Sequence, residues 1–215
     1  MSRVRVHNFS VSLDGFATGE GPTFEAPFGH AGNRLHEWFF ETRSFRRMQG
    51  SDGGDTGVDD AMAGTWDGEI GAEIMGRGKF WPQTGPWPDE EWKGWWGPNP
   101  PYHVPTFVLT HHARPPVAME GGTTFQFVTD GIHAALRRAS EAAGGKDVRL
   151  GGGVATIRQY LTAGLVDEMH LAVSPVLLGR GENLLGGIDA VSLGYECSEH
   201  VPTRQATHVV LTRRR

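Results

Sequence analysis

The chain has 215 residues, of which 38% are hydrophobic and 21% charged, so it can bury the core of a globular domain. Its formal net charge of −5 excludes the basic composition that is usual for proteins that bind a nucleic-acid backbone. The single cysteine, Cys197, excludes an intramolecular disulfide and favours a reducing, cytoplasmic location. We expect its side chain to be buried, because no nucleophile signature surrounds it.

The amino-terminal part of the sequence predicts one strand and one long helix. Polar and apolar residues alternate over residues 4–13, which indicates a strand rather than a secretory signal or a membrane span. This strand is expected to end at the turn signal of residues 14–15, and its alternation slips near Asn8, which indicates a bulge. Apolar side chains at helical spacing predict an amphipathic helix over residues 33–48, and the polar residues 49–57 predict a surface loop.

The middle of the sequence predicts a strand followed by an insertion rich in tryptophan, proline and glycine. The apolar run in "EIGAEIMGRGKF" predicts a short buried strand that breaks at Gly76, with a helix or turn from about Lys79. Residues 81–105 hold five tryptophans among many prolines and glycines, which excludes a long regular element. We interpret this insertion as a loop whose tryptophans pack on prolines or form a contact between subunits. A lid that stacks on an aromatic substrate is the alternative.

The second half of the sequence alternates predicted strands and helices. In chain order, we expect the strands 106–112 and 125–128, the helix 131–143, the strand 147–150, the helix 154–163, the strand 167–179 and an antiparallel hairpin over 195–214. This order predicts an α/β fold with a mixed, mainly parallel sheet flanked by helices. Because neither an internal repeat nor a domain boundary is visible, we expect a single domain over residues 1–215.

Three consecutive glycines, Gly151, Gly152 and Gly153, stand between a predicted strand and a predicted helix. Glycine lets the backbone approach a ligand, and the first amides of the helix are unpaired and partly positive, so a phosphate is well placed there. Thr156 adds a hydroxyl donor in the first turn. A tight strand-to-helix turn is the alternative, because the segment is neither a Walker loop nor the G-x-G-x-x-G fingerprint.

Donor side chains also follow two other predicted strands. Arg77 and Lys79 surround Gly78 after one strand, and Thr110 and His111 end another. Because the carboxyl ends of parallel strands meet at one edge of a sheet, these donors are expected to converge with the three glycines. A surface pair of cations and a polar loop are the alternatives.

The sequence predicts no metal site. It holds ten histidines but neither a CxxC nor an HExxH pattern. His111 and His112 are adjacent in sequence rather than one helical turn apart, so they do not form a metal-binding pair of that kind.

Five segments carry a resemblance to a known family. They are "SVSLDGF", "IMGRGKF", "VPTFVLTHH", "FVTDGIHAAL" and "VRLGGGVATIRQYLTAGLVDEMHLAVSPVLLGRGENLL". In this order they resemble the dihydrofolate reductase-like superfamily, and within it the branch related to the reductase domain of bacterial riboflavin biosynthesis. The resemblance implies a reductase that binds NADPH across the strand ends and a small-molecule substrate beside it, in a family in which homodimers are common.

The resemblance also implies which residues bind NADPH. The pyrophosphate would be held by Gly151, Gly152, Gly153, Val154, Ala155 and Thr156. The adenosine ribose and its 2′-phosphate would be surrounded by Arg77, Gly78, Lys79, Thr110 and His111. The nicotinamide would be bordered by Asn8, Phe9, Ser10, Val11, Phe16 and Ala17.

The substrate is expected to lie beside the helix that carries Trp38 and Phe39. Asn8, His36 and Phe39 are the residues that would bind it. True dihydrofolate reductases keep a carboxylate about one turn before the Trp-Phe pair, and here that position is Leu35. The resemblance therefore does not extend to folate reduction.

The implied reaction is hydride transfer to a C=N or C=O of a small pyrimidine-like or pterin-like heterocycle, or of a related carbonyl compound. A proton must follow the hydride, and Asp14 and Glu37 are the catalytic candidates, with His36 or a water as further sources. For Asp14, turn formation with Gly15 is an equal alternative. A catalytically inactive NADP(H)-binding sensor or assembly protein is the competing function.

Overall fold

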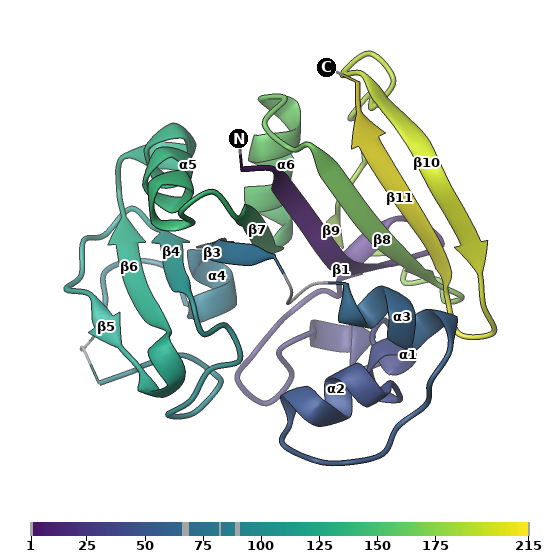
Figure 1. Ribbon diagram of the computed structural model, residues 1–215, viewed down its shortest axis with the longest axis horizontal. Coiled ribbons are helices and arrows are strands. Elements are labelled where there is room, and N and C mark those ends of the chain that lie inside the picture. Colours follow the sequence, from purple (N-terminus) through teal and green to yellow (C-terminus); the bar gives the residue numbers. More distant parts are fainter. Residues whose placement is uncertain (1, 66–68, 82, 89–90, 215) are drawn as a thin grey trace.

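The computed structural model describes residues 2–65, 69–81, 83–88 and 91–214, and strands form the centre of the fold (Figure 1). The described strands are β1 (Val4–Ser12), β2 (Phe16–Thr18), β3 (Ile70–Gly76), β4 (Pro105–Leu109), β5 (Val117–Ala118), β6 (Thr124–Val128), β7 (Asp147–Gly152), β8 (Glu168–Ser174), β9 (Glu182–Asn183), β10 (Tyr195–Pro202) and β11 (Thr207–Arg213). The main sheet has the order β10-β11-β8-β1-β7-β3-β4-β6-β5, and β2 pairs separately with β9.

The strand directions confirm the predicted fold class. All neighbours from β8 to β6 run parallel, whereas β10, β11 and β8 pair antiparallel. The short strand β5 is antiparallel to β6 at the other edge. The sheet is therefore mixed and mainly parallel, and the chain ends in the expected antiparallel hairpin.

Helices cover both faces of this sheet. They are α1 (Glu37–Phe40), α2 (Arg43–Met48), α3 (Val58–Gly64), α4 (Arg77–Phe80), α5 (Gly131–Ala142) and α6 (Val154–Thr162), with the 3-10 turns η1 (Gly29–Ala31) and η2 (Glu120–Gly122). In Figure 1, α1, α2 and α3 gather at the carboxyl end of β1. Among the described residues, no helix combines the length and the apolar composition that crossing a bilayer needs.

The main hydrophobic core lies between the sheet and helices α5 and α6. Ile74, Leu150 and Ile157 are fully buried in it, together with Ala135 of α5. Each large apolar side chain removed from water contributes about 1.5–3 kcal/mol, so this layer fixes α6 against β7 and β3. The start of α6 is thereby held at the edge of the sheet.

The helix expected over residues 33–48 is wrong, because the structure has two short helices there. Thr42 lies between α1 and α2, where its hydroxyl accepts a hydrogen bond from the Phe45 amide at 3.1 Å and donates one to the Phe39 carbonyl at 2.7 Å. The threonine therefore caps α2 and stops α1. Its backbone also forms a bridge with Asp55 in the following loop.

The bulge expected near Asn8 is confirmed. Asn8 has a left-handed backbone, with φ 53°, and the register between β1 and β8 shifts between Val6 and Phe9. On its other side, β1 pairs with β7 only through Val4 and Arg5. The sheet is therefore open between β1 and β7 beyond this point.

The expectation that Cys197 is buried is wrong, because its side chain is exposed. Cys197 lies in β10, the edge strand of the sheet, whose residues 196–200 are all exposed. An edge strand has a neighbour on one side only, so this cysteine is less covered than the residues of the central strands.

The insertion over 81–105 packs onto the sheet through its aromatic rings. Trp96 stacks on Phe125 of β6 with ring centroids 5.9 Å apart, and it contacts Tyr102 edge to face. The indole nitrogen of Trp92 donates to the Phe80 carbonyl at 2.8 Å. These contacts favour the interpretation as a structural loop over the lid. Pro82, Asp89 and Glu90 lie outside the described residues.

We predict that Trp96→Ala lowers the free energy of unfolding by about 3 kcal/mol, because it removes a ring packed on Phe125. Urea unfolding followed by circular dichroism measures the change. Leu177→Ala is the control, since Leu177 is 70% exposed, and it should change the stability by less than about 0.5 kcal/mol. Equal stabilities for the two variants would contradict the packing role of the insertion.

Candidate active site

The three predicted donor segments meet at one edge of the sheet. The end of β3 pairs with the end of β7, where Met75 lies opposite Gly152, and with the end of β4, where Gly76 lies opposite Leu109. A Cβ on Gly76 would lie 2.2 Å from the hydroxyl of Thr156. The structure thus brings the glycine loop, residues 151–153, beside residues 77–79, and residues 110–111 follow the next strand at the same edge of the sheet.

Each glycine of the loop has a different environment. A Cβ on Gly151 would lie 2.0 Å from a carboxylate oxygen of Glu73, so only glycine fits there. Gly152 has φ +112°, a conformation that favours glycine, and the peptide bond to Gly153 is cis. Gly153 has φ −71°, and a Cβ there would meet nothing within 4 Å. Packing therefore explains why position 151 needs glycine, and backbone geometry explains why position 152 does. Neither reason applies to Gly153, beside which there is open space.

The open space lies at the start of α6. The amides of Thr156 and Ile157 donate to the Gly153 carbonyl, both at 3.1 Å. Within the described part of the chain, the amides of Val154 and Ala155 have no acceptor. Unpaired amides at a helix start carry partial positive charge, so this end can bind an anion such as a phosphate.

A buried ion cluster of Glu73, Arg149 and Lys79 contacts the glycine loop and holds its backbone in place. The Glu73 side chain is 1% exposed and accepts from the Arg149 Nε at 2.9 Å and from the Lys79 Nζ at 3.2 Å. Lys79 also donates to the Gly151 carbonyl at 2.7 Å. Burial lowers the pKa of Lys79, and the Glu73 carboxylate opposes that shift. Lys79 thus holds the loop in this structure, and its predicted contact with a 2′-phosphate stays a prediction.

Two members of the site, Glu73 and Arg149, are not among the residues predicted from the sequence. The signal that could have found Glu73 is a carboxylate in the otherwise apolar strand "IGAEIMG", because a buried charge needs a partner. Arg149 stands in alternation with buried residues of β7. Nothing local in the sequence shows that these two side chains meet.

The remaining residues predicted for the adenosine end lie at the same edge of the sheet. The Arg77 guanidinium lies 4.0 Å from the centre of the Trp87 ring and donates to the Gly85 carbonyl. Its Nε and Nη2 atoms are buried without an acceptor among the described residues. The Thr110 hydroxyl accepts from the His112 amide at 3.1 Å. Gly78 and His111 are exposed.

The residues predicted for the nicotinamide end come from β1 and β2. The Ser10 hydroxyl is buried and accepts from the Trp38 indole at 2.9 Å. Val11 and Ala17 are buried in the main core. A ring carbon of Phe9 lies 3.3 Å from the position that a Cβ of Gly152 would take, so β1 reaches the glycine loop through this side chain.

Asp14 is held by the chain itself. Its carboxylate accepts from the Ser12 hydroxyl at 2.5 Å and from the amides of Leu178 and Gly179 at 3.1 and 2.7 Å. These hydrogen bonds, that of Ser12 first, lower its pKa to about 2. The geometry favours the turn-forming alternative, and the catalytic role of Asp14 stays a prediction.

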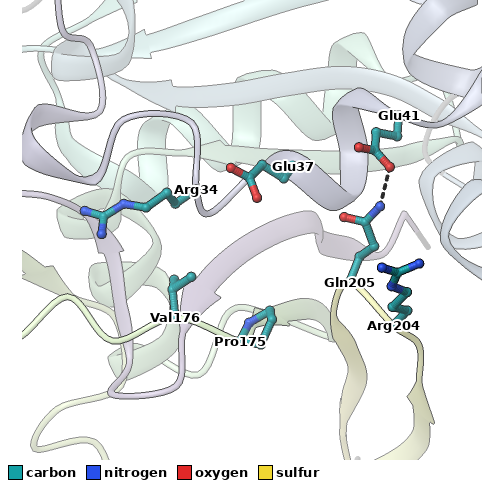
Figure 2. A pocket seen from close by; sticks show the side chains of 7 residues that line it. All are labelled: Arg34, Glu37, Glu41, Pro175, Val176, Arg204 and Gln205. Carbon is teal, nitrogen blue, oxygen red and sulfur yellow. Dashed lines mark hydrogen bonds between the residues drawn. The ribbon is translucent and has the colours of Figure 1, made fainter.

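Glu37 is exposed and lines a cleft of about 400 Å³ beside α1. Figure 2 shows its carboxylate on the side of Arg34, and the hydrogen bond from Gln205 to Glu41 on the opposite side. The described lining includes neither the glycine loop nor Asp14. The catalytic role of Glu37 therefore stays a prediction.

Two of the three predicted substrate residues, His36 and Phe39, lie in an aromatic cluster at α1. The His36 ring lies between Phe28 and Phe40, with centroids 4.4 and 5.9 Å away. Burial lowers its pKa to about 4, so the ring is neutral near pH 7. Phe39 packs against Phe45, with centroids 5.2 Å apart. Asn8 lies elsewhere in the site, at the bulge of β1.

Leu35 occupies the position of the missing carboxylate. Its side chain is fully buried beside Ala31 and Leu178. Its carbonyl accepts from the Ser174 hydroxyl at 2.8 Å. An apolar residue at this position provides no charge for a pterin ring.

The sequence matches one protein family over nearly its whole length. The family, described as "RibD C-terminal domain", matches residues 5–209. A curated relative, the uncharacterized protein YyaP of Bacillus subtilis (strain 168), is 38% identical over 58 residues. That match covers 27% of this chain and 30% of the relative, so the chain matches less than a third of it.

Several solved structures share the fold. A protein assigned to riboflavin biosynthesis from Shewanella sp. PV-4 is 21% identical, with TM-score 0.58 and full coverage of both chains. A diaminohydroxyphosphoribosylaminopyrimidine deaminase/5-amino-6-(5-phosphoribosylamino)uracil reductase of Thermotoga maritima is 11% identical, with TM-score 0.53, over 99% of this chain and 57% of its own. A pyrimidine reductase-like protein of Corynebacterium diphtheriae is 14% identical, with TM-score 0.53, over 100% and 92%. The resemblance stated from the five sequence segments is confirmed by the family match.

We predict that Gly151→Ala lowers the free energy of unfolding by about 2 kcal/mol, because the added methyl group overlaps the Glu73 carboxylate and the Lys79 ammonium. Urea unfolding of the two proteins measures the difference. Gly57→Ala is the control, since a Cβ on Gly57 would meet nothing within 4 Å. Equal loss in both variants would show that the ion cluster does not require glycine at position 151.

Proposed function

Because the chain belongs to the RibD C-terminal domain family, we propose that it is an NADPH-dependent reductase. The proposed reaction transfers hydride to a C=N or C=O of a small pyrimidine-like or pterin-like heterocycle, or of a related carbonyl compound. The observation that carries the proposal is the open start of α6 behind Gly153, at the edge of the sheet where the ends of β7, β3 and β4 meet. Ligands of open α/β sheets bind at such edges.

The residues present fit NADPH in two places. The unpaired amides of Val154 and Ala155, with the space beside Gly153, suit a pyrophosphate. The Arg77 guanidinium has two nitrogen atoms without an acceptor among the described residues, and a guanidinium suits a second phosphate. We therefore assign the pyrophosphate to residues 151–156 and the 2′-phosphate to the segment that begins at Arg77.

The chain would orient the reactants and exclude water. When bound, NADPH supplies the hydride. Phe9 fills the space between β1 and the glycine loop, and its ring would shield the reacting face from water. With a pKa of about 2, Asp14 holds no proton near pH 7. A water is therefore a better source than Asp14 of the proton that the substrate nitrogen or oxygen must receive.

Two of the structural relatives guide the choice of substrate. The Thermotoga maritima protein is named as a reductase of a phosphoribosylamino-uracil, and the Corynebacterium diphtheriae protein as pyrimidine reductase-like. A substituted pyrimidine is therefore the first substrate class to test. A homodimer, which the family resemblance implies, and a cytoplasmic location, which the single cysteine favours, stay predictions.

A second candidate function follows from Leu35. The buried apolar side chain at this position leaves the substrate wall without the carboxylate that dihydrofolate reductases keep. An NADP(H)-binding sensor or assembly protein without catalysis would need the loop of residues 151–153 but not that carboxylate. Binding of NADPH without oxidation on a broad panel of pyrimidine, pterin and carbonyl substrates would favour this function.

We predict that Gly153→Ala weakens NADPH binding about tenfold, because its Cβ would enter the space beside the free amides. The stability should change by less than about 0.5 kcal/mol, since φ is −71° and the space is open. Fluorescence titration with NADPH measures the affinity, and Gly57→Ala is the matched control. Unchanged affinity in Gly153→Ala would contradict the assignment of the loop.

The absorbance of NADPH at 340 nm tests the reaction itself. We expect it to fall in the presence of 5-amino-6-(5-phosphoribosylamino)uracil, the compound in the name of the Thermotoga maritima relative, and not with dihydrofolate. No fall with any substrate of the panel, despite NADPH binding, would contradict the proposed reductase.

A further inference from the structure

Apart from the Glu73 cluster, a line of hydrogen-bonded polar side chains joins α3, β11, β8 and β1. The Asp59 carboxylate lies 2.7 Å from the Nε2 atom of His208, and the Nδ1 atom of His208 lies 2.9 Å from the Nε2 atom of His170. The Nδ1 atom of His170 lies 3.2 Å from the backbone nitrogen of Asn8. His208 and His170 are 0% and 4% exposed, so both rings lie inside the protein, whereas the Asp59 side chain is 23% exposed.

The hydrogen positions in this line follow from its two ends. The Asn8 backbone N–H can only donate, so the Nδ1 atom of His170 accepts. Burial, together with His208, lowers the pKa of His170 to about 4, so the ring is neutral near pH 7 and its hydrogen lies on Nε2. That hydrogen is donated to the Nδ1 atom of His208. The hydrogen of His208 therefore lies on Nε2 and faces Asp59.

The inner end of this line holds the β1 bulge. The side-chain amide of Asn8 donates to the Ala63 carbonyl of α3 at 3.0 Å, while the backbone amide donates to His170. The left-handed φ of Asn8 takes its N–H out of the regular ladder with β8, so the histidine replaces a strand as the acceptor. The next residue, Phe9, lies against Gly152 of the glycine loop. Bulges beside functional sites commonly aim a side chain in this way.

A metal site does not explain the cluster. Among the described residues, no group of three or more histidine, cysteine or acidic side chains is arranged to hold an ion. The groups instead form a line in which Asn8 donates to His170, His170 to His208 and His208 to Asp59. The Trp38 ring packs edge to face against both imidazole rings, with its centroid 5.0 Å from that of His208 and 6.3 Å from that of His170. A carboxylate that orients a histidine, which orients the next group, is a known way to fix a tautomer.

We propose that Asp59, His208 and His170 are positioning residues that fix the Asn8 bulge, and through it Phe9, against the glycine loop. The expected effect of these residues on catalysis rests on the proposed function. Their effect on the tautomers and on the bulge does not, because both exist without substrate. The relay, as we call Asp59, His208 and His170, does not touch the reacting atoms. It orients the segment of β1 that would border the nicotinamide.

His208→Leu tests the relay, because it removes the acceptor of the His170 Nε2–H. We expect His170 to move its hydrogen partly to Nδ1, where the Asn8 side-chain oxygen lies 3.1 Å away. Imidazole nitrogen shifts measured by NMR report the tautomer. The Asn8 amide should exchange with solvent about tenfold faster once its acceptor is lost. His200→Leu is the matched control, since His200 is an exposed histidine on the neighbouring strand.

Asp59→Asn is a second variant that keeps the volume of the side chain. It removes the charge that holds the His208 hydrogen on Nε2, so a mixture of tautomers is expected at His170. With a reducible substrate, both relay variants should lower kcat about tenfold while the affinity for NADPH changes less than about threefold. A merely structural role would not move the tautomer or separate kcat from NADPH affinity.

The two proposals fail in different ways. If the unaltered protein reduces no substrate, the proposed function fails, and the tautomer and amide exchange still test the relay. A His170 hydrogen on Nδ1 in the unaltered protein would overturn the relay. Asn8 exchange and kcat in His208→Leu equal to those in His200→Leu would overturn it as well.

Discussion

The buried carboxylate of Glu73 is the constraint on which the candidate site depends. A charge taken out of water costs several kcal/mol unless it is paired, and Arg149 and Lys79 pair it. Lys79 also binds the Gly151 carbonyl, and the carboxylate leaves no room for a Cβ at position 151. The ion cluster and the glycine loop therefore require each other. Together they set where α6 begins and where its two free amides face.

The site lies where the order of strands changes direction. After β1, the chain builds β3, β4 and β6 on one side, and then returns through β7 to place β8, β11 and β10 on the other. The sheet opens between β1 and β7 beyond Arg5, and such a point is where α/β folds bind ligands. Two buried polar clusters flank the opening: the Glu73 cluster supports the loop, and the relay supports the bulge. They meet where Phe9 packs on Gly152.

Local patterns in the sequence predicted the sheet and the glycine loop, because periodicity and turn residues act within a few positions. The prediction of one helix over residues 33–48 was wrong because Thr42 caps α2 and ends α1, although the apolar residues follow helical spacing on both sides of it. The predicted burial of Cys197 was wrong because burial depends on which strand lies at the edge of the sheet. The relay could not be predicted, since Asp59 and His208 are 149 residues apart in sequence and meet only in the fold. Glu73, a charge within an apolar strand, was the one visible sign of the ion cluster.

The most direct test of the account is a titration of the isotopically labelled protein with NADPH, followed through its backbone amide signals. We expect the largest shifts at Gly153, Val154 and Ala155, with smaller shifts around Phe9 and none in the edge strand of residues 195–202. Shifts confined to the cleft lined by Arg34 and Arg204, or no binding at all, would contradict it.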